Sequence, residues 1–376
     1  MFRKYSNEPL AFICFTSFPA WNNDHIIMSA AKKDIRSLNP DDLQRYLLDL
    51  GQPAFRARQI EEWVWRRSCK DFSEMSNIPK DLREKLEETF SIHQIIVDDL
   101  QRSKDGTIKN GVKLHDGRVV ESVLIPTDKR ITACISSQVG CSLDCHFCAT
   151  ANLPRMRNLN AEEIFDQVVT ITQQAEKYFQ RPLTNIVYMG MGEPLLNYAN
   201  VLKSIDKITA DEGLNMAAKR ITVSTVGVAK MMKQFADDNP RCNLALSLHS
   251  ARNEVRESIM PITKSNPIEM LRDALLYWYN KTGKKPTFEY VIWKGINDAP
   301  EDIKALVKLC KQVPSKVNII EYNPIGDDRF KMADKSVIDN YINALGEVGV
   351  VAKVRQSRGQ DIDAACGQLA NKNAAL

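Results

Sequence analysis

The sequence is poor in cysteine, has almost no excess of either charge, and lacks a long apolar run. Nine cysteines in 376 residues are too few for a fold held together by disulfides. Lys and Arg outnumber Asp and Glu by only 51 to 47, which permits an RNA partner without predicting one. The sequence shows no low-complexity segment or short-period repeat. These features exclude disulfide-rich and disordered classes and leave a globular protein.

An apolar stretch near the N-terminus, Leu10 to Trp21, follows Arg3 and Lys4 and loosely imitates a secretory signal. It is shorter than the run of about 20 apolar residues that a membrane helix needs. Met28 lies just before charged, helix-prone sequence and is a plausible true start in place of Met1. We therefore expect a cytoplasmic protein without membrane contact.

The length predicts one large domain and one or two smaller ones. We predict four segments along the chain. Residues 1–33 form an N-terminal extension, 34–93 a helical module, 94–130 a short β section, and 131–376 the main domain with a C-terminal catalytic segment. The main domain is thus expected to carry the chemistry.

Apolar residues recur at helical spacing between Leu38 and Phe90. Asn39 to Asp42 is a helix-start signal, and Gly51 is expected to end the helix that follows. Two further helices are predicted in the rest of this module. The module is a candidate RNA-contacting part of the chain, although solvated helix faces explain such charges about as often. Its basic residues are Arg56, Arg58, Arg66, Arg67 and Lys70.

From Gln94 to Thr127 the apolar period shifts towards two, with turns expected at Asp105-Gly106 and Asp116-Gly117. After this antiparallel section, six short apolar runs alternate with amphipathic helical stretches. Six units are fewer than the eight of a closed barrel, so we predict an α/β fold with an open or partial (βα)6 barrel. The runs are Ile131–Ser136, Asn185–Met189, Ile221–Thr225, Asn243–Leu248, Thr287–Trp293 and Val317–Tyr322.

Polar and glycine-rich motifs follow five of these runs. They are Cys141 to Cys148, Gly190 to Pro194, Ser224, Ser247 to His249, and Asn323. In parallel α/β proteins the carboxyl ends of the strands meet at one edge, where ligands bind. The placement of the motifs therefore predicts a single site at that edge.

Four of the nine cysteines lie between Cys134 and Cys148, which indicates metal or redox chemistry in a reducing compartment. Cys141, Cys145 and Cys148 form a CxxxCxxC pattern, whose spacing fits neither the usual zinc knuckle nor a thioredoxin-type CxxC. Three thiolates can hold three corners of a [4Fe-4S] cluster and leave the fourth iron open to a ligand. The alternatives are a zinc site completed by Cys134 or His146, and a chance grouping of buried thiols.

The cysteine pattern resembles the radical S-adenosylmethionine superfamily, and Met189 to Pro194 resembles that superfamily's second motif. The resemblance implies contacts to S-adenosylmethionine by Gly192 and Glu193. Two further stretches, Ala133 to Cys141 and Arg358 to Leu369, are similar to RNA adenine methyltransferases of the RlmN/Cfr family. The similarity keeps its order and spacing over nearly the whole chain.

The resemblance implies a methyltransferase that uses a [4Fe-4S] cluster and S-adenosylmethionine to methylate C2 of an adenine in RNA. The implied substrates are adenine 2503 of 23S rRNA (ribosomal RNA) and adenine 37 of some tRNAs. An electron donor such as flavodoxin is an implied partner, and we expect a monomer. Methylation at C8, as in the Cfr branch, is an alternative that the motifs leave open. A rival of another class is a zinc-dependent RNA-binding protein without catalytic activity.

The resemblance also implies catalytic roles for three residues. Cys366 is implied to take a methyl group from S-adenosylmethionine and to carry it to the adenine. Cys134 is implied to release the product by forming a disulfide with Cys366, and Glu121 to remove the ring proton. By residue type alone, both cysteines could be buried packing residues, and Glu121 could be the solvent face of a strand.

Further contacts to S-adenosylmethionine are implied at the strand ends. A serine at such a position could instead cap the following helix, and a histidine could be a satisfied core residue. We also expect the target adenine to be extruded into the barrel mouth, because proteins read unstacked bases in RNA. The implied contact residues are Ser224, Ser247, Leu248, His249 and Asn323.

Overall fold

The computed structural model describes residues 32–371. The candidate starts Met1 and Met28 and the apolar stretch Leu10 to Trp21 lie outside the described residues, as does nearly all of the predicted extension. None of the helices in the described part has the length and apolar character needed to cross a bilayer.

The N-terminal module is helical, as its apolar spacing predicted. Its elements are α1 (Pro40–Asp49), α2 (Phe55–Glu61), a π-helical turn (Glu62–Arg66) and α3 (Lys80–Thr89). The Asn39 side chain accepts a hydrogen bond from Asp42 N at 2.7 Å and so caps α1. Gly51 follows this helix with a φ of +72°, which a residue without Cβ adopts at no steric cost. Leu47 and Ile60 are fully buried in the core.

The module is joined to the main sheet region by a buried charge network around Arg36. β1 (Lys33–Asp34) pairs in parallel with β2 (Phe90–Ser91), which brings the two ends of the module together. Arg36 is 5% exposed and forms ion pairs with Asp34 at 3.0 Å and with Asp166 at 2.7 Å. Asp166 belongs to α4 (Ala161–Phe179), so the network crosses from the module to a helix of the main domain.

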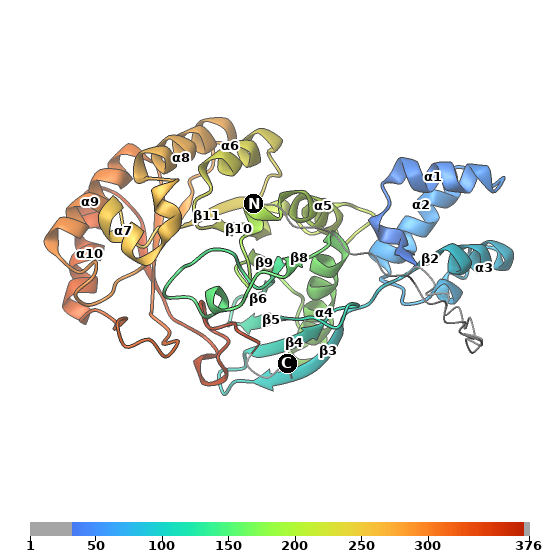
Figure 1. The fold of residues 1–376 in the computed structure, drawn as a ribbon, viewed down its shortest axis with the longest axis horizontal. Coiled ribbons are helices and arrows are strands. Elements are labelled where there is room, and N and C mark those ends of the chain that lie inside the picture. The colour runs from blue at the N-terminus through green and yellow to red at the C-terminus, as the bar shows by residue number, and fades with distance from the viewer. Residues whose placement is uncertain (1–31, 372–376) are drawn as a thin grey trace, which may run out of the picture. The chain divides into compact units, whose positions relative to one another are not determined.

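The main domain is built on a ten-stranded sheet (Figure 1). Three strands are antiparallel and seven are parallel to one another. The antiparallel strands are β3 (Ile96–Arg102), β4 (Ile108–Lys113) and β5 (Val119–Pro126). The parallel strands are β6 (Ile131–Cys134), β9 (Asn185–Tyr188), β10 (Ile221–Thr225), β11 (Asn243–Ser247), β12 (Thr287–Val291), β13 (Lys316–Ile320) and β14 (Ala352–Arg355). Their order is β14-β13-β12-β11-β10-β9-β6-β5-β4-β3.

The six apolar runs of the sequence are the strands β6 and β9 to β13, so the α/β fold is confirmed. β14 is a seventh parallel strand that the apolar pattern did not reveal, because it alternates small and apolar residues with Lys353 and Arg355 at the edge of the sheet. The predicted antiparallel section is also present. It extends the main sheet, since β5 pairs with β6 and places Val123 opposite Cys134.

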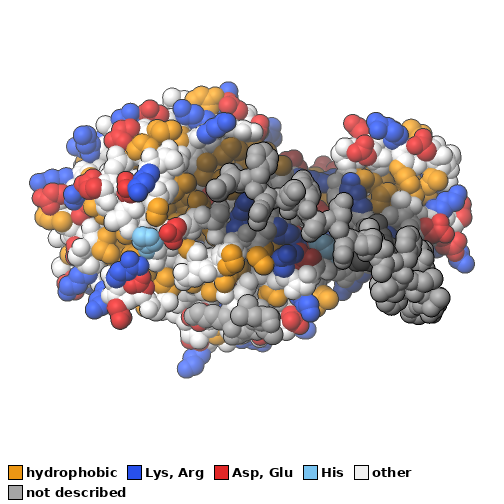
Figure 2. Space-filling model, viewed as in Figure 1, with side chains coloured by type: hydrophobic (Ala, Val, Ile, Leu, Met, Phe, Trp, Pro, Cys, Tyr) orange, Lys and Arg blue, Asp and Glu red, His pale blue; other side chains and the backbone are white. Residues whose placement is uncertain are grey.

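Helices connect the parallel strands and lie along the outer side of the sheet (Figure 1). α4 begins with a capping box, in which the Glu163 carboxylate accepts from Asn160 N at 2.9 Å. Basic and acidic side chains are interspersed over the face drawn in Figure 2, which fits the small net charge. The remaining helices are α5 (Tyr198–Thr209), α6 (Ala229–Asp238), α7 (Asn253–Ile259), α8 (Ile268–Thr282), α9 (Pro300–Gln312) and α10 (Lys335–Glu347).

Candidate active site

A cavity of about 590 Å³ lies at the carboxyl ends of the parallel strands. A cavity of this size suits a cofactor-sized ligand. The strand ends therefore bring most of the predicted site residues to one place, as the sequence predicted. Those that line the cavity are Cys134, Cys145, Cys148, Gly192, Glu193, Ser224, Ser247, His249, Asn323 and Cys366.

Three predicted site residues do not line this cavity. Cys141 is half-buried, and its sulfur accepts a hydrogen bond from Leu143 N at 3.5 Å. Leu248 is fully buried, and its backbone N–H donates to Glu289 O at 3.0 Å. Glu121 is buried in β5 and binds the C-terminal tail, as described below.

The loop from Cys141 to Cys148 places three thiols where they influence one another. Burial raises the pKa of Cys141 to about 11, with Cys148 acting in the same direction, and burial also raises the pKa values of Cys145 and Cys148. Within residues 32–371 no three His, Cys, Asp or Glu side chains converge closely enough to hold a metal ion. The three thiols lie on one short loop, and Cys145 and Cys148 line the cavity. Thiolates are the donors that an iron–sulfur cluster takes.

The C-terminal segment packs on this loop and carries Cys366 into the cavity. Ala149 N donates to Gly367 O at 2.7 Å, and Thr150 Oγ1 donates to Leu369 O at 2.6 Å across 219 positions of sequence. From the other side, Asn323 Nδ2 donates to Cys366 O at 3.2 Å. One backbone and two side-chain donors therefore hold the segment around the predicted carrier thiol, next to the residues that follow the predicted cluster loop.

Cys134, the last residue of β6, faces the same cavity. Burial raises the pKa of its thiol to about 12. The Cys366 thiol acts in the same direction, and the Arg355 guanidinium opposes both. Both cysteines are free thiols in this structure. The two residues predicted to form a disulfide thus line one cavity, with the Cys366 thiol close enough to Cys134 to raise its pKa.

The turn after β9 needs glycine for packing. A Cβ on Gly190 would lie 2.6 Å from Ser136 Oγ and 2.8 Å from Ile135 C, and Gly192 adopts a φ of +91° against Gln138. The next residue, Glu193, is buried, and its carboxylate accepts from Leu195 N at 3.0 Å and from Val226 N at 2.9 Å. Burial raises the pKa of Glu193 to about 7 although these hydrogen bonds oppose the shift.

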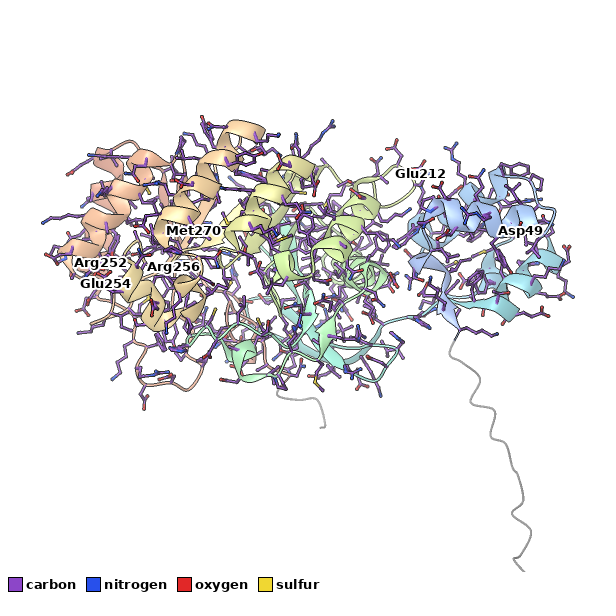
Figure 3. All side chains as sticks on the ribbon, turned by 45° about the horizontal axis from the view of Figure 1, so that its top comes forward. Asp49, Glu212, Arg252, Glu254, Arg256 and Met270 are labelled. Carbon is purple, nitrogen blue, oxygen red and sulfur yellow. The ribbon has the colours of Figure 1, made fainter. Side chains whose placement is uncertain are left out.

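The loops after β10 and β11 are joined by Arg256 of α7, labelled in Figure 3. This fully buried guanidinium donates to Val226 O, to Ser247 O at 3.2 Å and to Leu248 O at 3.1 Å. Next to it, His249 Nδ1 accepts from Val291 N at 3.1 Å, and burial lowers the pKa of His249 to about 3. His249 is therefore a neutral acceptor fixed in the wall of the cavity.

Glu121 anchors the tail of the chain. Its Oε2 accepts from Ala370 N at 2.8 Å and from Asn371 N at 3.1 Å, and its Oε1 lies 3.4 Å from Lys109 Nζ. Asn371 also donates from its side chain to Val119 O at 2.7 Å. In this structure the carboxylate is occupied by the tail and does not face the cavity.

Three cavity residues were missed by the sequence reasoning. Glu289 is 4% exposed, and its Oε1 accepts from Asn318 Nδ2 at 2.9 Å, while Oε2 lies 3.9 Å from Arg355 Nη1 without a hydrogen bond. Trp293 Nε1 is likewise buried without a partner among the described residues. A carboxylate inside an apolar run could have identified Glu289. Arg355 carried no such signal, because β14 itself was not predicted.

Comparisons with known proteins identify the family of the chain. Residues 33–92 match the family "Ribosomal RNA large subunit methyltransferase N-terminal domain", and residues 135–310 match the "Radical SAM superfamily". A relative from Flavobacterium psychrophilum, named a probable dual-specificity RNA methyltransferase RlmN, is 59% identical over 92% of this chain and 99% of its own length. The dual-specificity RNA methyltransferase RlmN of Geobacter sulfurreducens is 41% identical over 91% of this chain and 93% of its own length.

A solved structure extends the similarity to the fold. The crystal structure of a radical SAM methyltransferase from Sphaerobacter thermophilus superposes with a TM-score of 0.83 at 37% identity, and it covers 90% of this chain and 99% of that one. The sequence similarity runs through the helical module, the sheet and the tail alike. The chain belongs to the RlmN family of dual-specificity RNA methyltransferases within the radical SAM superfamily.

Proposed function

We propose that this protein methylates C2 of adenine 2503 in 23S rRNA and of adenine 37 in some tRNAs, with Cys366 as the methyl carrier. The observation that carries the proposal is that Cys366 lines the same cavity as Cys145 and Cys148, and that the residues after Cys366 are hydrogen-bonded to Ala149 and Thr150, which follow the cysteine loop. A carrier thiol must meet both a methyl donor and a substrate base, so it needs a place between the cluster loop and the cavity mouth.

The residues present fit the cofactors of the radical SAM superfamily, a [4Fe-4S] cluster and S-adenosylmethionine. We assign the cluster to Cys141, Cys145 and Cys148. When bound, this pair of cofactors supplies the radical chemistry that an unactivated ring carbon requires. Leu248 would act through its backbone, since its side chain is fully buried. The residues assigned to S-adenosylmethionine are Gly192, Glu193, Ser224, Ser247, Leu248, His249 and Asn323.

Two thiols carry out the covalent steps assigned to the chain. Cys366 carries the methyl group as a thioether on its sulfur. Cys134 then forms a sulfur–sulfur bond with Cys366 as the carbon–sulfur bond to the product breaks. The pKa of Cys134, raised to about 12 by burial, keeps its thiol protonated at rest and prevents early attack.

We assign removal of the ring proton to Glu121. This role requires Ala370 and Asn371 to move away, because Glu121 Oε2 accepts both of their backbone N–H groups in this structure. An electron donor such as flavodoxin is part of the same proposal, as is a monomeric enzyme in the cytoplasm. Methylation at C8 would use the same two thiols. Identifying the methylated carbon of the product therefore distinguishes C8 from C2.

The test compares four anaerobically purified proteins: wild type, Cys366→Ala, Cys134→Ala and the control Cys310→Ala. Cys310 is buried on α9 and does not line the cavity. We expect wild type and Cys310→Ala to methylate both a 23S rRNA fragment and a tRNA anticodon stem-loop. Cys366→Ala should keep its iron and sulfide but transfer no methyl group, and Cys134→Ala should accumulate a covalent protein–RNA adduct. Mass spectrometry and NMR of the modified nucleoside identify the carbon.

Three results would contradict parts of this proposal. Methyl transfer by Cys366→Ala would remove the carrier thiol. A C8-methyl product would show that the enzyme methylates C8 and not C2 of the adenine. A colourless protein with stoichiometric zinc and no iron would instead support an RNA-binding protein without catalytic activity.

A further inference from the structure

Three arginine side chains line the cavity. They are Arg130, Arg355 and Arg358, and Cys366 lines it with them. Arg130 is exposed, and the side chains of Arg355 and Arg358 are 33% and 37% exposed, with Arg355 lying 3.9 Å from Glu289. Of the acidic residues that line the cavity, Glu193 and Glu289 are buried, and Glu321 is half-buried and accepts a hydrogen bond from Ser357 N. The charges of Arg130 and Arg358 are therefore open to solvent, whereas Arg355 has Glu289 beside it.

Arg130 stands on a rigid turn. Thr127 N donates to Arg130 O at 2.8 Å, which closes the turn between β5 and β6. Arg181 holds this turn from below, because its guanidinium donates to Thr127 O at 2.9 Å and to Asp128 O at 3.1 Å. Within residues 32–371 the Arg130 guanidinium forms no ion pair, although Asp128 shares its turn. A fixed turn thus presents a cation without an internal counter-charge.

Arg358 stands on the segment that follows β14. Ser357 N donates to Glu321 Oε2 at 2.9 Å, and Gly359 N donates to Asp105 Oδ2 at 2.9 Å, so both neighbours of Arg358 are held. The Arg358 guanidinium is 4.0 Å from Asp105, at the limit of an ion pair. Thr107 N also donates to Asp105, so backbone donors already use the Asp105 carboxylate. Among the described residues this contact is the ion pair of Arg358, and its guanidinium makes no hydrogen bond, so its donors can bind a further anionic group.

We propose that Arg130 and Arg358 bind the RNA phosphates that flank the target nucleotide while its base enters the cavity. This inference rests on the proposed function. A nucleotide extruded from its stack leaves its backbone at the mouth of the pocket. A guanidinium presents a planar fork of donors that matches phosphate oxygens. Two such groups on separate segments would hold the backbone while Cys366, which lines the same cavity, meets the base.

The test measures RNA binding and methyl loading separately in Arg130→Gln, Arg358→Gln and the double variant. Fluorescence anisotropy with a substrate stem-loop is recorded over a range of salt concentrations. Each single variant should weaken binding about fivefold to tenfold and lower the slope of log K against log salt by about one, and the double variant should lower it by about two. Compared with Arg130→Gln, Arg130→Lys should recover only part of the RNA affinity, because it loses the planar fork of donors. It should recover the whole salt slope, because it keeps the positive charge.

Methyl loading of Cys366 without RNA, followed by mass spectrometry of the intact protein, should be unchanged in these variants. The matched control is Arg272→Gln. Arg272 lies on α8 outside the cavity and is paired with Asp273 at 2.8 Å, so its loss should leave affinity and slope as in wild type. Unfolding curves and iron content show whether each variant is folded.

Unchanged RNA affinity and salt slope in the folded double variant would overturn the inference, even if wild type methylates RNA normally. Reduced methyl loading at limiting S-adenosylmethionine would also overturn it, because the arginines would then serve the cofactor. If wild type itself neither binds nor methylates RNA, the proposed function fails, and the assignment of these two arginines fails with it.

Discussion

Buried polar groups differ between two regions of the molecule: the joint between the helical module and the main domain, and the cavity at the strand ends. At the joint, the Arg36 guanidinium donates to Asp34, to Asp166 and to His93 O. In the cavity wall, Glu289 Oε2 and Trp293 Nε1 are buried without a hydrogen-bond partner among the described residues. The chain satisfies the first set itself and leaves the second incomplete.

This difference separates structural polarity from functional polarity. A buried polar atom without a partner costs about 1–3 kcal/mol, so folded proteins keep few of them. Glu289 and Trp293 line the cavity, where a ligand can complete their hydrogen bonds. The joint is expected to respond to mutation through stability, and the cavity through pH and ligand binding.

The largest expected effect on stability is at the joint. Arg36→Ala should lower the free energy of unfolding by about 3–5 kcal/mol, because it leaves the carboxylates of Asp34 and Asp166 buried and uncompensated. Urea unfolding measures the loss. Arg45→Ala is the control, since Arg45 is 73% exposed in a 3.6 Å pair with Asp42 and should cost less than about 0.5 kcal/mol. Equal losses in both variants would erase the contrast between joint and surface.

The next effect is an acid-side loss of stability from His249 in the cavity. Its folded pKa, lowered to about 3 by burial, lies below the ordinary histidine value of 6.5, so the unfolded chain takes up the proton first as the pH falls. Stability is therefore present above about pH 6.5 and lost below it. Wild type should lose about 2 kcal/mol relative to His249→Asn between about pH 7 and pH 5. The Asn side chain can still accept the hydrogen bond from Val291 N, so this variant removes only the titrating group. If wild type and variant lost stability in parallel as the pH fell, His249 would not be a buried neutral imidazole.

Glu193 should change stability in the opposite direction, with a loss of stability as the pH rises. Its folded pKa, raised to about 7 by burial, exceeds the ordinary glutamate value of 4.5. Its contribution to stability is therefore present below about pH 4.5 and is lost as the pH rises through about 7. We expect wild type to lose about 1–2 kcal/mol relative to Glu193→Gln between about pH 5 and pH 7, in urea unfolding at matched cluster content. The variant has its own constant cost, since an amide cannot accept from both Leu195 N and Val226 N. A pH-independent difference would mean that Glu193 stays ionised in the folded protein.

The smallest effects concern ion pairs at the rim of the joint. Lys207 Nζ lies 2.9 Å from Glu61 Oε1, with side chains 21% and 23% exposed, and a double-mutant cycle with Lys207→Met and Glu61→Gln should give a coupling of about 0.5–1 kcal/mol. Arg58 and Glu212, the latter labelled in Figure 3, are 3.9 Å apart and much more exposed. Their coupling should be near zero. A coupling as large as that of Lys207 and Glu61 would show that exposure does not set the strength of these pairs.

Most of the fold was predictable from local pattern. The apolar runs located six of the seven parallel strands, and the Asn39 cap and Gly51 bounded the first helix. The exception, β14, has too few apolar residues to be seen as a strand. It exists because β13 offers it an edge, with Val317 opposite Ala352 and Ile320 opposite Arg355. Pairing of this kind depends on tertiary context and leaves no periodic signal.

The site was predictable in its residue types but not in all of its contacts. The cysteine spacing and the strand-end motifs identified most residues that line the cavity. The sequence could not show that Glu121 is bound by Ala370 and Asn371, since 249 and 250 positions separate them from it. Nor could it place Arg355 beside the two thiols. Such contacts follow from the order of strands in the sheet.

The sequence by itself determined the local elements, the CxxxCxxC loop and the family, because these depend on spacing between neighbours along the chain. Only the tertiary structure decided which cysteines share a cavity. The segment after β14 returns to the residues that follow the cysteine loop, where Ala149 N donates to Gly367 O and Thr150 Oγ1 donates to Leu369 O. These contacts join residues more than 200 positions apart, so no local pattern in the sequence could specify them, and they bring Cys366, the proposed methyl carrier, into the cavity that Cys145 and Cys148 also line.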